Sequence, residues 1–119
     1  MKPSDASFYE VKARMIAVMA NPKRLQIVDL LSDGEKTVSE LSEGLGLAQA
    51  TTSQHLAVMR KAGVVETTRK GNYVHYRLAD PKIASACGVM SQAVLDLLVK
   101  QQKKLQPVLA LANMQRQGG

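Results

Sequence analysis

The chain has 119 residues, a net charge of +6 and an apolar content of 45%, which suits one domain, residues 1–119, with a modest core. Trp is absent and Phe8 is the only Phe, so the stacking aromatics of a single-stranded nucleic-acid platform are missing. No uninterrupted apolar run approaches the roughly 18 residues of a membrane span, and we expect neither a signal peptide nor a membrane partner. A single cysteine, Cys87, excludes an internal disulfide and fits a reducing cytoplasm.

Charge is distributed unevenly along the chain. Residues 25–46 carry five acids and one base, whereas residues 47–78 carry five bases and one acid. The segment after Asp96 has four bases and no acid. Basic segments are where a polyanion would be contacted. From charge alone, an acidic substrate or a membrane surface remains possible.

The first third of the chain predicts two helices and the start of a third. After a short N-terminal arm, apolar residues spaced i, i+3, i+7 and i+10 predict a helix over about 5–19, with Ser4 or Asp5 as its N-cap. Asn21-Pro22 ends this helix and opens a second one, which stops at the turn signal Ser32-Asp33-Gly34. The segment Thr37-Val-Ser-Glu40 is a capping box, which predicts the start of a third helix.

The stretch Leu47–Gly63 predicts a fourth helix with two different faces. One side gathers four residues that we expect to be buried: Thr52, Leu56, Val58 and Met59. The other sides carry amides, hydroxyls and a cation: Gln49, Thr51, Ser53, Gln54 and Arg60. Amides and hydroxyls can bond base edges and phosphates from a helix in a major groove. Two short helices over about 37–62, joined by a glycine-containing turn, form a helix-turn-helix pattern, although any compact pair of helices is an alternative.

Residues 64–78 predict a β-hairpin directly after this helix pair. Two alternating, β-branched segments flank the turn dipeptide Gly71-Asn72, and Arg69 and Lys70 lie at the tip. A basic hairpin in this position is typical of a wing that contacts the phosphate backbone or a narrow minor groove. An edge hairpin made soluble by charge is the alternative.

The last helix is predicted over about 82–106, after Asp80-Pro81, with Pro107 ending or kinking it and a flexible tail over about 113–119. Its apolar residues are spaced 4, 3, 4 and 3, which makes a heptad-like seam: Ile83, Cys87, Met90, Val94 and Leu97. Such a seam packs within its own domain or against a second copy of the chain. We favour dimerisation, because the first helix offers a second apolar stripe and the domain has little core to share.

Several motifs in order resemble one family. They are Ala20-Asn-Pro-Lys-Arg-Leu-Gln-Ile27, Glu40-Leu41, Gly44-Leu-Gly-Leu47, Ser53-Gln-His-Leu56, the Ala62-Gly63-Val-Val turn and Tyr73-Val-His-Tyr-Arg-Leu78. This pattern is similar to the ArsR/SmtB family of bacterial and archaeal repressors. The resemblance implies a mainly α fold with a small β-hairpin, a winged helix-turn-helix in the order α-α-α-α-β-β-α. It also implies a homodimer through the first and last helices that blocks a promoter until an effector releases it.

The resemblance also implies which residues touch DNA. The family's base-reading positions match Gln49, Ala50, Ser53 and Gln54, with Thr51 and His55 beside them. Backbone contacts are expected from Arg60 and from three residues of the hairpin tip: Arg69, Lys70 and Asn72. Two positions depart from the family. Ala48 replaces the usual Ser or Thr cap, and Thr52 replaces a core Val, so its hydroxyl needs a partner, for which we expect the carbonyl one turn back.

The family's metal sites do not carry over to this chain. Where relatives that sense soft ions have a Cys-Val-Cys run, this chain has Thr37-Val38-Ser39, and hydroxyls are poor ligands for soft ions. Where zinc sensors have histidines on the last helix, this chain has Lys82 and Ala93, although Asp80 and Asp96 fall near the carboxylate positions. We therefore expect no metal and no cofactor. His75 is expected to pack, and Cys87 is expected to be a buried structural thiol, with a redox sensor as the alternative.

These observations predict a sequence-specific regulator that binds double-stranded DNA. The specific expectation is a dimeric repressor on an imperfect inverted repeat, at a promoter near its own gene, in the cytoplasm at the nucleoid, with an unknown effector. A thiol-responsive repressor acting through Cys87, a non-specific architectural DNA-binding protein and a protein–protein adaptor are the alternatives. An enzyme is not expected, because there is no nucleophile–base pair, metal cluster or phosphate-cradling glycine loop.

Overall fold

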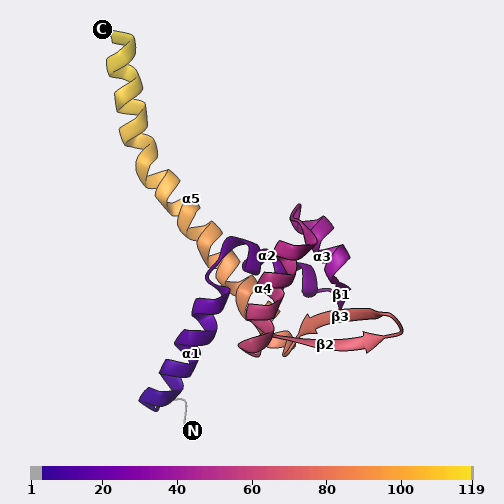
Figure 1. Ribbon diagram of the computed structural model, residues 1–119. Coiled ribbons are helices and arrows are strands. Elements are labelled where there is room, and N and C mark those ends of the chain that lie inside the picture. Colours follow the sequence, from indigo (N-terminus) through magenta and orange to yellow (C-terminus); the bar gives the residue numbers. More distant parts are fainter. Residues whose placement is uncertain (1–3, 119) are drawn as a thin grey trace. The chain divides into compact units, whose positions relative to one another are not determined.

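The computed structural model describes residues 4–118 (Figure 1). Its elements are α1 (Ala6–Met19), α2 (Pro22–Leu31), β1 (Lys36–Thr37), α3 (Val38–Leu45), α4 (Gln49–Lys61), β2 (Val65–Lys70), β3 (Tyr73–Leu78) and α5 (Pro81–Gly118). This order confirms the expected mainly α fold with a hairpin between α4 and α5. The chain separates into two units, residues 1–87 and 88–119. The expectation of one domain over the whole chain stays a prediction.

Local capping signals determine where the helices of the first unit begin and end. Asn21 caps α2, since its side chain accepts hydrogen bonds from the amides of Lys23 and Arg24 at 3.0 and 3.2 Å. The capping box at α3 is formed in both directions between Thr37 and Glu40. Gly46 ends α3 in the left-handed region, with φ of 66°. These boundaries hold α3 and α4 in the tight succession that a helix-turn-helix needs.

The hydrophobic core lies where α2, α3, α4 and the start of β2 meet. Its buried apolar residues are Ile27, Val28, Leu31, Leu41, Leu45, Leu56, Met59, Val64 and Val65. Gly44 brings α3 close to α2, because a Cβ there would lie 3.0 Å from the side chain of Leu30. The core therefore packs the helix-turn-helix against α2 and anchors the base of the hairpin.

The hairpin is part of a three-stranded antiparallel sheet with strand order β1-β3-β2. β2 pairs with β3 from Val65↔Leu78 to Lys70↔Tyr73, and β1 adds the pairs Lys36↔Tyr76 and Thr37↔His75. The sequence indicated the two hairpin strands but not β1. Two residues are too few for the alternation by which a strand is recognised. β1 ties the wing to the segment that precedes α3.

The second unit consists of α5 beyond Cys87, and here two expectations were wrong. The helix neither ends at Pro107 nor gives way to a tail at 113, but continues to Gly118 with Pro107 inside it. The residues around the proline explain this, because Leu, Ala, Met, Gln and Lys dominate the segment and favour a helix. They offset the hydrogen bond that the proline removes.

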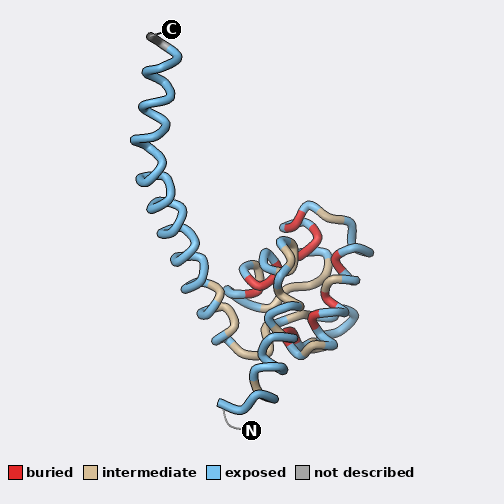
Figure 2. The backbone as a smooth tube through the Cα atoms, turned by 90° about the vertical axis from the view of Figure 1, so that its left-hand side faces the viewer, coloured by how far each residue is buried: buried red, intermediate tan, exposed pale blue. Residues whose placement is uncertain are grey.

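Each residue from Gly88 to Arg116 is exposed, as the colour of the backbone shows in Figure 2. These exposed residues include large apolar ones of the types Leu, Val and Met. By length and composition α5 could cross a membrane, with a mean hydropathy of 1.4 in its most apolar window. The helix also carries polar residues among its apolar ones, and three of them are spaced 4 and 7 apart along one line: Gln92, Asp96 and Lys103. The seam that begins at Ile83 and Cys87 therefore continues, exposed, through Met90, Val94 and Leu97.

Candidate nucleic-acid interface

The candidate interface begins with α4, whose inner face is fixed by the core. Thr52, Leu56 and Met59 are buried as expected. Val58 remains 40% exposed and lines a pocket with residues of α1. The Thr52 hydroxyl donates to the Ala48 carbonyl at 3.0 Å, which confirms the partner expected from the sequence. Ala48 provides no side-chain cap, so the first turn of α4 keeps amide groups without a side-chain acceptor.

The outer face of α4 carries the residues expected to meet DNA. Those that are exposed are Gln49, Ala50, Thr51, Ser53, Gln54 and Arg60. Ala50, Gln54 and Lys61 are spaced 4 and 7, so they follow one line along the side of the helix opposite the core. The first two turns offer small, uncharged groups, and the cations come in the last turn. This arrangement combines hydrogen-bonding groups for base edges with charge for phosphates.

Gln49 connects the two helices of the helix-turn-helix. Its Nε2 donates to the Ser39 Oγ of α3 at 2.9 Å, and both side chains are exposed. The amide oxygen of Gln49 keeps its acceptor capacity for a second partner. Gln49 is therefore oriented by α3 before it meets a ligand.

His55, expected to contact a phosphate beside the base-reading positions, has a hydrogen-bond partner within the domain, and its phosphate contact stays a prediction. It is half-buried, and its Nδ1 accepts a hydrogen bond from Arg24 Nε at 3.1 Å. Arg24 also donates to the carbonyl of Val18 at 3.1 Å. The pair joins the end of α1, α2 and α4 across the domain. His55 thus orients α4 from within, and only its second ring nitrogen is left for an outside partner.

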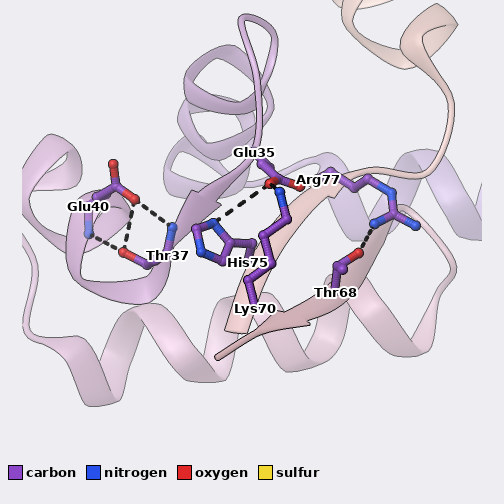
Figure 3. A network of polar contacts seen from close by, with 7 residues as sticks. All are labelled: Glu35, Thr37, Glu40, Thr68, Lys70, His75 and Arg77. Carbon is purple, nitrogen blue, oxygen red and sulfur yellow. Dashed lines mark hydrogen bonds and ion pairs between the residues drawn. The ribbon is translucent and has the colours of Figure 1, made fainter. Parts of the chain in front are cut away.

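The wing presents one cation freely and holds two others. Among the described residues, the Arg69 guanidinium has no hydrogen-bond or ion-pair partner, and Asn72 lies exposed in the hairpin turn. Lys70 instead forms an ion pair and a hydrogen bond with Glu35, in the loop before β1 (Figure 3). Lys70 lies at the end of β2 beside the hairpin turn, and its expected contact with a phosphate stays a prediction. The Lys70 ammonium is also the main reason that the pKa of Glu35 is lowered from its ordinary value.

Arg77 is the second held cation, and it belongs to β3. Its guanidinium forms an ion pair with Glu66 at 3.0 Å and donates to the hydroxyl of Thr68, both on β2. Arg77 also lines a shallow groove of about 390 Å³ with Arg60 at the end of α4. Two guanidinium groups therefore lie beside the junction of α4 and the wing.

Thr37 and Asp80, at two positions of the family's metal sites, have other partners. Thr37 and Glu40 bind each other in the capping box, and the Asp80 carboxylate accepts hydrogen bonds from the backbone and side chain of Lys82. Among the described residues, no three His, Cys, Asp or Glu side chains gather in a metal-binding group. The residues present at these positions do not fit a transition-metal ion.

Cys87 is half-buried on the seam of α5, against the core. Burial raises the pKa of its thiol, and the negative charge of Asp29 adds to this shift. The thiol lines an apolar pocket of about 360 Å³ with Met15, Met19 and Ile83. This environment disfavours the thiolate, which is the nucleophilic form of cysteine.

Three side chains near the interface were not anticipated from the sequence. Arg24 and Glu35 act through partners 31 and 35 residues away, and no local spacing reveals such contacts. Tyr73, 68% exposed, lies beside the hairpin turn and pairs with Lys70 in register. Its position next to Asn72 in the turn was a usable signal, because an exposed aromatic at a wing tip has no core to fill.

A helix-turn-helix with a polar outer face, followed by a basic hairpin, defines the class of winged helix-turn-helix DNA-binding regulators. The comparison with known proteins gives the family. Residues 21–67 match the model of bacterial regulatory proteins of the arsR family, and the chain belongs to this family. Its members are DNA-binding transcriptional regulators, not enzymes.

Relatives with known structures match most of this chain. The chain is 37% identical over 91 residues to Rv0081 of Mycobacterium tuberculosis, an uncharacterized HTH-type transcriptional regulator, covering 76% of this chain and 80% of that protein. The crystal structure of Rv0081 matches with a TM-score of 0.73 and 34% identity, over 82% and 98% of the two chains.

Two further relatives are informative. The homodimeric winged helix-turn-helix DNA-binding domain of Mb0332 from Mycobacterium bovis matches with a TM-score of 0.71 and 31% identity, over 85% and 93% of the chains. The biofilm growth-associated repressor of Xylella fastidiosa is 40% identical over 72 residues, 60% of this chain and 63% of that protein.

Proposed function

We propose that this protein is a dimeric, sequence-specific repressor of a promoter close to its own gene, acting without the family's usual metal sites. The outer face of α4 carries the proposal. An architectural protein indifferent to sequence needs cations along this face, whereas Gln49, Ser53 and Gln54 are uncharged hydrogen-bonding groups. The repressor name of the Xylella fastidiosa relative supports the direction of regulation. The expected location is the cytoplasm, at the nucleoid.

We assign base readout to the first two turns of α4 and backbone contacts to its end and the wing. Gln49, Ala50, Thr51, Ser53 and Gln54 would face base edges and nearby phosphates. Phosphates would be contacted by a second group: Arg60, Arg69, Lys70 and Asn72. His55 supports α4 through Arg24 and contributes at most one ring nitrogen.

The partner of the apolar surfaces is a second copy of this chain. α1 leaves Tyr9, Val11 and Ile16 between 40% and 55% exposed, and α5 exposes its seam. The homodimeric Mb0332 domain supports a two-chain assembly. A two-fold dimer presents its recognition helices to successive major grooves about 34–36 Å apart, so the operator is an imperfect inverted repeat.

The assignment is tested by selecting duplex DNA from the organism's own genome with the purified protein and footprinting the selected sites. Gln54→Ala should then cost about 1–3 kcal/mol of affinity and relax the preference at one base position. Gln92→Ala, the same change on an exposed face of α5, is the matched control and should leave that preference intact. A footprint over a single half-site from a monomer contradicts the dimeric proposal.

Arg69→Ala separates charge from readout. Losing a free wing cation should weaken binding to all sequences alike and reduce the slope of log affinity against log salt by about one. A change of base preference in Arg69→Ala, or an unchanged preference in Gln54→Ala, contradicts the assignment. A reporter gene under the selected promoter distinguishes repression from activation.

Metal ions should leave operator binding nearly unchanged. Other residues replace the family's cysteine and histidine ligands, and the Asp80 carboxylate accepts a hydrogen bond from Lys82. Cys87 offers only one sulfur per chain. Allosteric release by zinc, cadmium, lead or arsenite needs a coupling of roughly 1–3 kcal/mol, which an anisotropy titration detects readily. A tenfold, chelator-reversible loss of binding that vanishes in Cys87→Ser makes Cys87 the sensor, which is the second candidate function.

A further inference from the structure

Glu35, an acid in the loop before β1, faces basic side chains of the wing. Its carboxylate contacts the Lys70 ammonium, and its Oε1 lies 3.9 Å from Nδ1 of His75 (Figure 3). The guanidinium of Arg77 contributes a further favourable charge. Glu35 is only partly exposed, with 29% of its side chain accessible, whereas 57% of Lys70 is accessible. A carboxylate therefore occupies a position beside the wing to which the basic side chains would otherwise attract a phosphate oxygen.

The backbone holds Glu35 at this place. Gly34, with φ of 147°, precedes it, and β1 follows it directly. β1 pairs with β3 through Lys36↔Tyr76 and Thr37↔His75, so the residue before β1 is kept next to the strand that carries His75. The contact with Lys70 thus follows from the strand pairing that the sequence did not reveal.

We propose that Glu35 restrains the DNA affinity of the wing by holding Lys70 in an intramolecular ion pair and placing a negative charge beside the phosphate path. This inference rests on the proposed function. For Lys70 to contact a phosphate, its ammonium must leave Glu35, and the carboxylate left behind repels the same phosphate. Arg69 then contributes fully to DNA affinity, whereas Lys70 contributes less because its ion pair with Glu35 must first be broken.

A bracing role for Glu35 predicts the opposite sign. If the ion pair were needed to order the wing, its removal would weaken DNA binding. However, exposed ion pairs contribute little to stability. The wing is also fixed by the β1–β3 pairing and by Val64 and Val65, which are buried at its base. Restraint therefore dominates over bracing.

The test is a double-mutant cycle with Glu35→Gln and Lys70→Ala, measured by fluorescence anisotropy on a short labelled duplex of mixed sequence over a series of salt concentrations. Glu35→Gln should bind roughly two- to fivefold more tightly at low salt, with a salt slope steeper by about one. In the wild-type background, Lys70→Ala should weaken binding less than Arg69→Ala does, because Glu35 already limits the contribution of Lys70. When it is combined with Glu35→Gln, the same change should cancel the gain in both affinity and slope.

Asp33→Asn is the matched control, because it lies in the same loop and removes one negative charge. Its partner is Lys36, at 3.0 Å, which is not part of the hairpin. Asp33→Asn should leave the salt slope unchanged. Weaker binding by Glu35→Gln, an equal gain from Asp33→Asn, or equal costs of Lys70→Ala in both backgrounds overturns the inference. Thermal unfolding of each variant verifies that the fold is retained.

The cycle also distinguishes the two proposals. If the wild-type protein binds the duplex with a normal salt dependence and the cycle shows no coupling, Glu35 has no restraining role while DNA binding stands. If the wild-type protein does not bind duplex DNA at any salt concentration, the proposed function and this inference both fail.

Discussion

The two units of this chain use the same kinds of apolar residue and treat them in opposite ways. Residues 4–87 bury nine apolar side chains, whereas residues 88–116 bury none. Ile83 and Cys87 pack against the core, and the same seam continues through Met90, Val94 and Leu97, which are 46–64% exposed. An amphipathic pattern identifies a face that needs a partner, but it does not say whether that partner lies in the same chain.

Apolar side chains in the two units also contribute differently to stability. A side chain buried within the first unit contributes to unfolding whatever the protein concentration. A side chain on the distal seam of α5 contributes only when a second copy covers it, so its effect depends on concentration. Substitutions of the same residue type in the two units therefore test the comparison directly.

The largest expected effect is that of Leu56→Ala. Leu56 is fully buried in α4, so the substitution should lower the free energy of unfolding by about 2–5 kcal/mol. Leu97→Ala, on a side chain that is 55% exposed, should cost less than about 0.5 kcal/mol at concentrations where the protein is monomeric. Urea unfolding followed by circular dichroism measures both. Equal costs for the two leucines would mean that the second unit has an internal partner.

Next in size is the effect of charge on the distal seam. Leu97→Asp should weaken dimerisation more than tenfold, because a carboxylate buried between two helices loses its hydration. Leu95→Asp is the matched control, since Leu95 is also 55% exposed but lies about 160° away around the helix, off the seam. Sedimentation velocity over a range of concentrations measures the dissociation constant. Equal effects of the two substitutions would exclude the seam as the dimer contact.

The sequence was sufficient for features that depend on neighbours within one turn or one hairpin. The capping box at Thr37, the helix stop at Gly63 with φ of 81°, and the Thr52 back-bond are all local, and each was predicted correctly. Gly71, with φ of 62°, likewise forms the expected turn. Such features are determined by residue types at fixed offsets, which a single sequence displays.

The sequence was insufficient where partners lie far apart along the chain. The pairs Arg24–His55 and Glu35–Lys70 depend on how α2 and β1 pack, and they give His55 and Lys70 intramolecular partners that the sequence did not indicate. The length of α5 was underestimated for a different reason. Pro107 was expected to end or kink the helix, and the helix does not end there because the good helix formers on both sides of it outweigh one lost hydrogen bond.

A smaller effect is expected for Cys87, at the boundary between the two units. Because the pKa of its thiol is raised, a smaller fraction is thiolate at any pH below that pKa than in a free cysteine. Iodoacetamide at pH 8 should therefore alkylate the folded protein several-fold more slowly than the urea-unfolded protein. The difference should shrink as the pH rises and both thiols ionise. Faster alkylation in the folded state would favour the thiol-responsive alternative.

The smallest expected effect is that of Thr52→Val. This change tests how much the Thr52 hydroxyl, on the buried side of α4, contributes to stability. The Thr52 Oγ1 donates to the Ala48 carbonyl, which also accepts the Thr52 backbone amide at 3.0 Å, so removing the hydroxyl leaves no buried group unpaired. Valine fills a similar volume and adds apolar contact with Leu56 one turn away. The change should stabilise the protein by at most about 0.5 kcal/mol, because a well-satisfied local hydrogen bond is exchanged for a small gain in apolar burial. Thr52→Ala, which leaves a cavity instead, should destabilise it, and urea unfolding of the pair gives both signs. Destabilisation by more than about 1 kcal/mol in Thr52→Val would mean that the hydroxyl has a partner beyond Ala48.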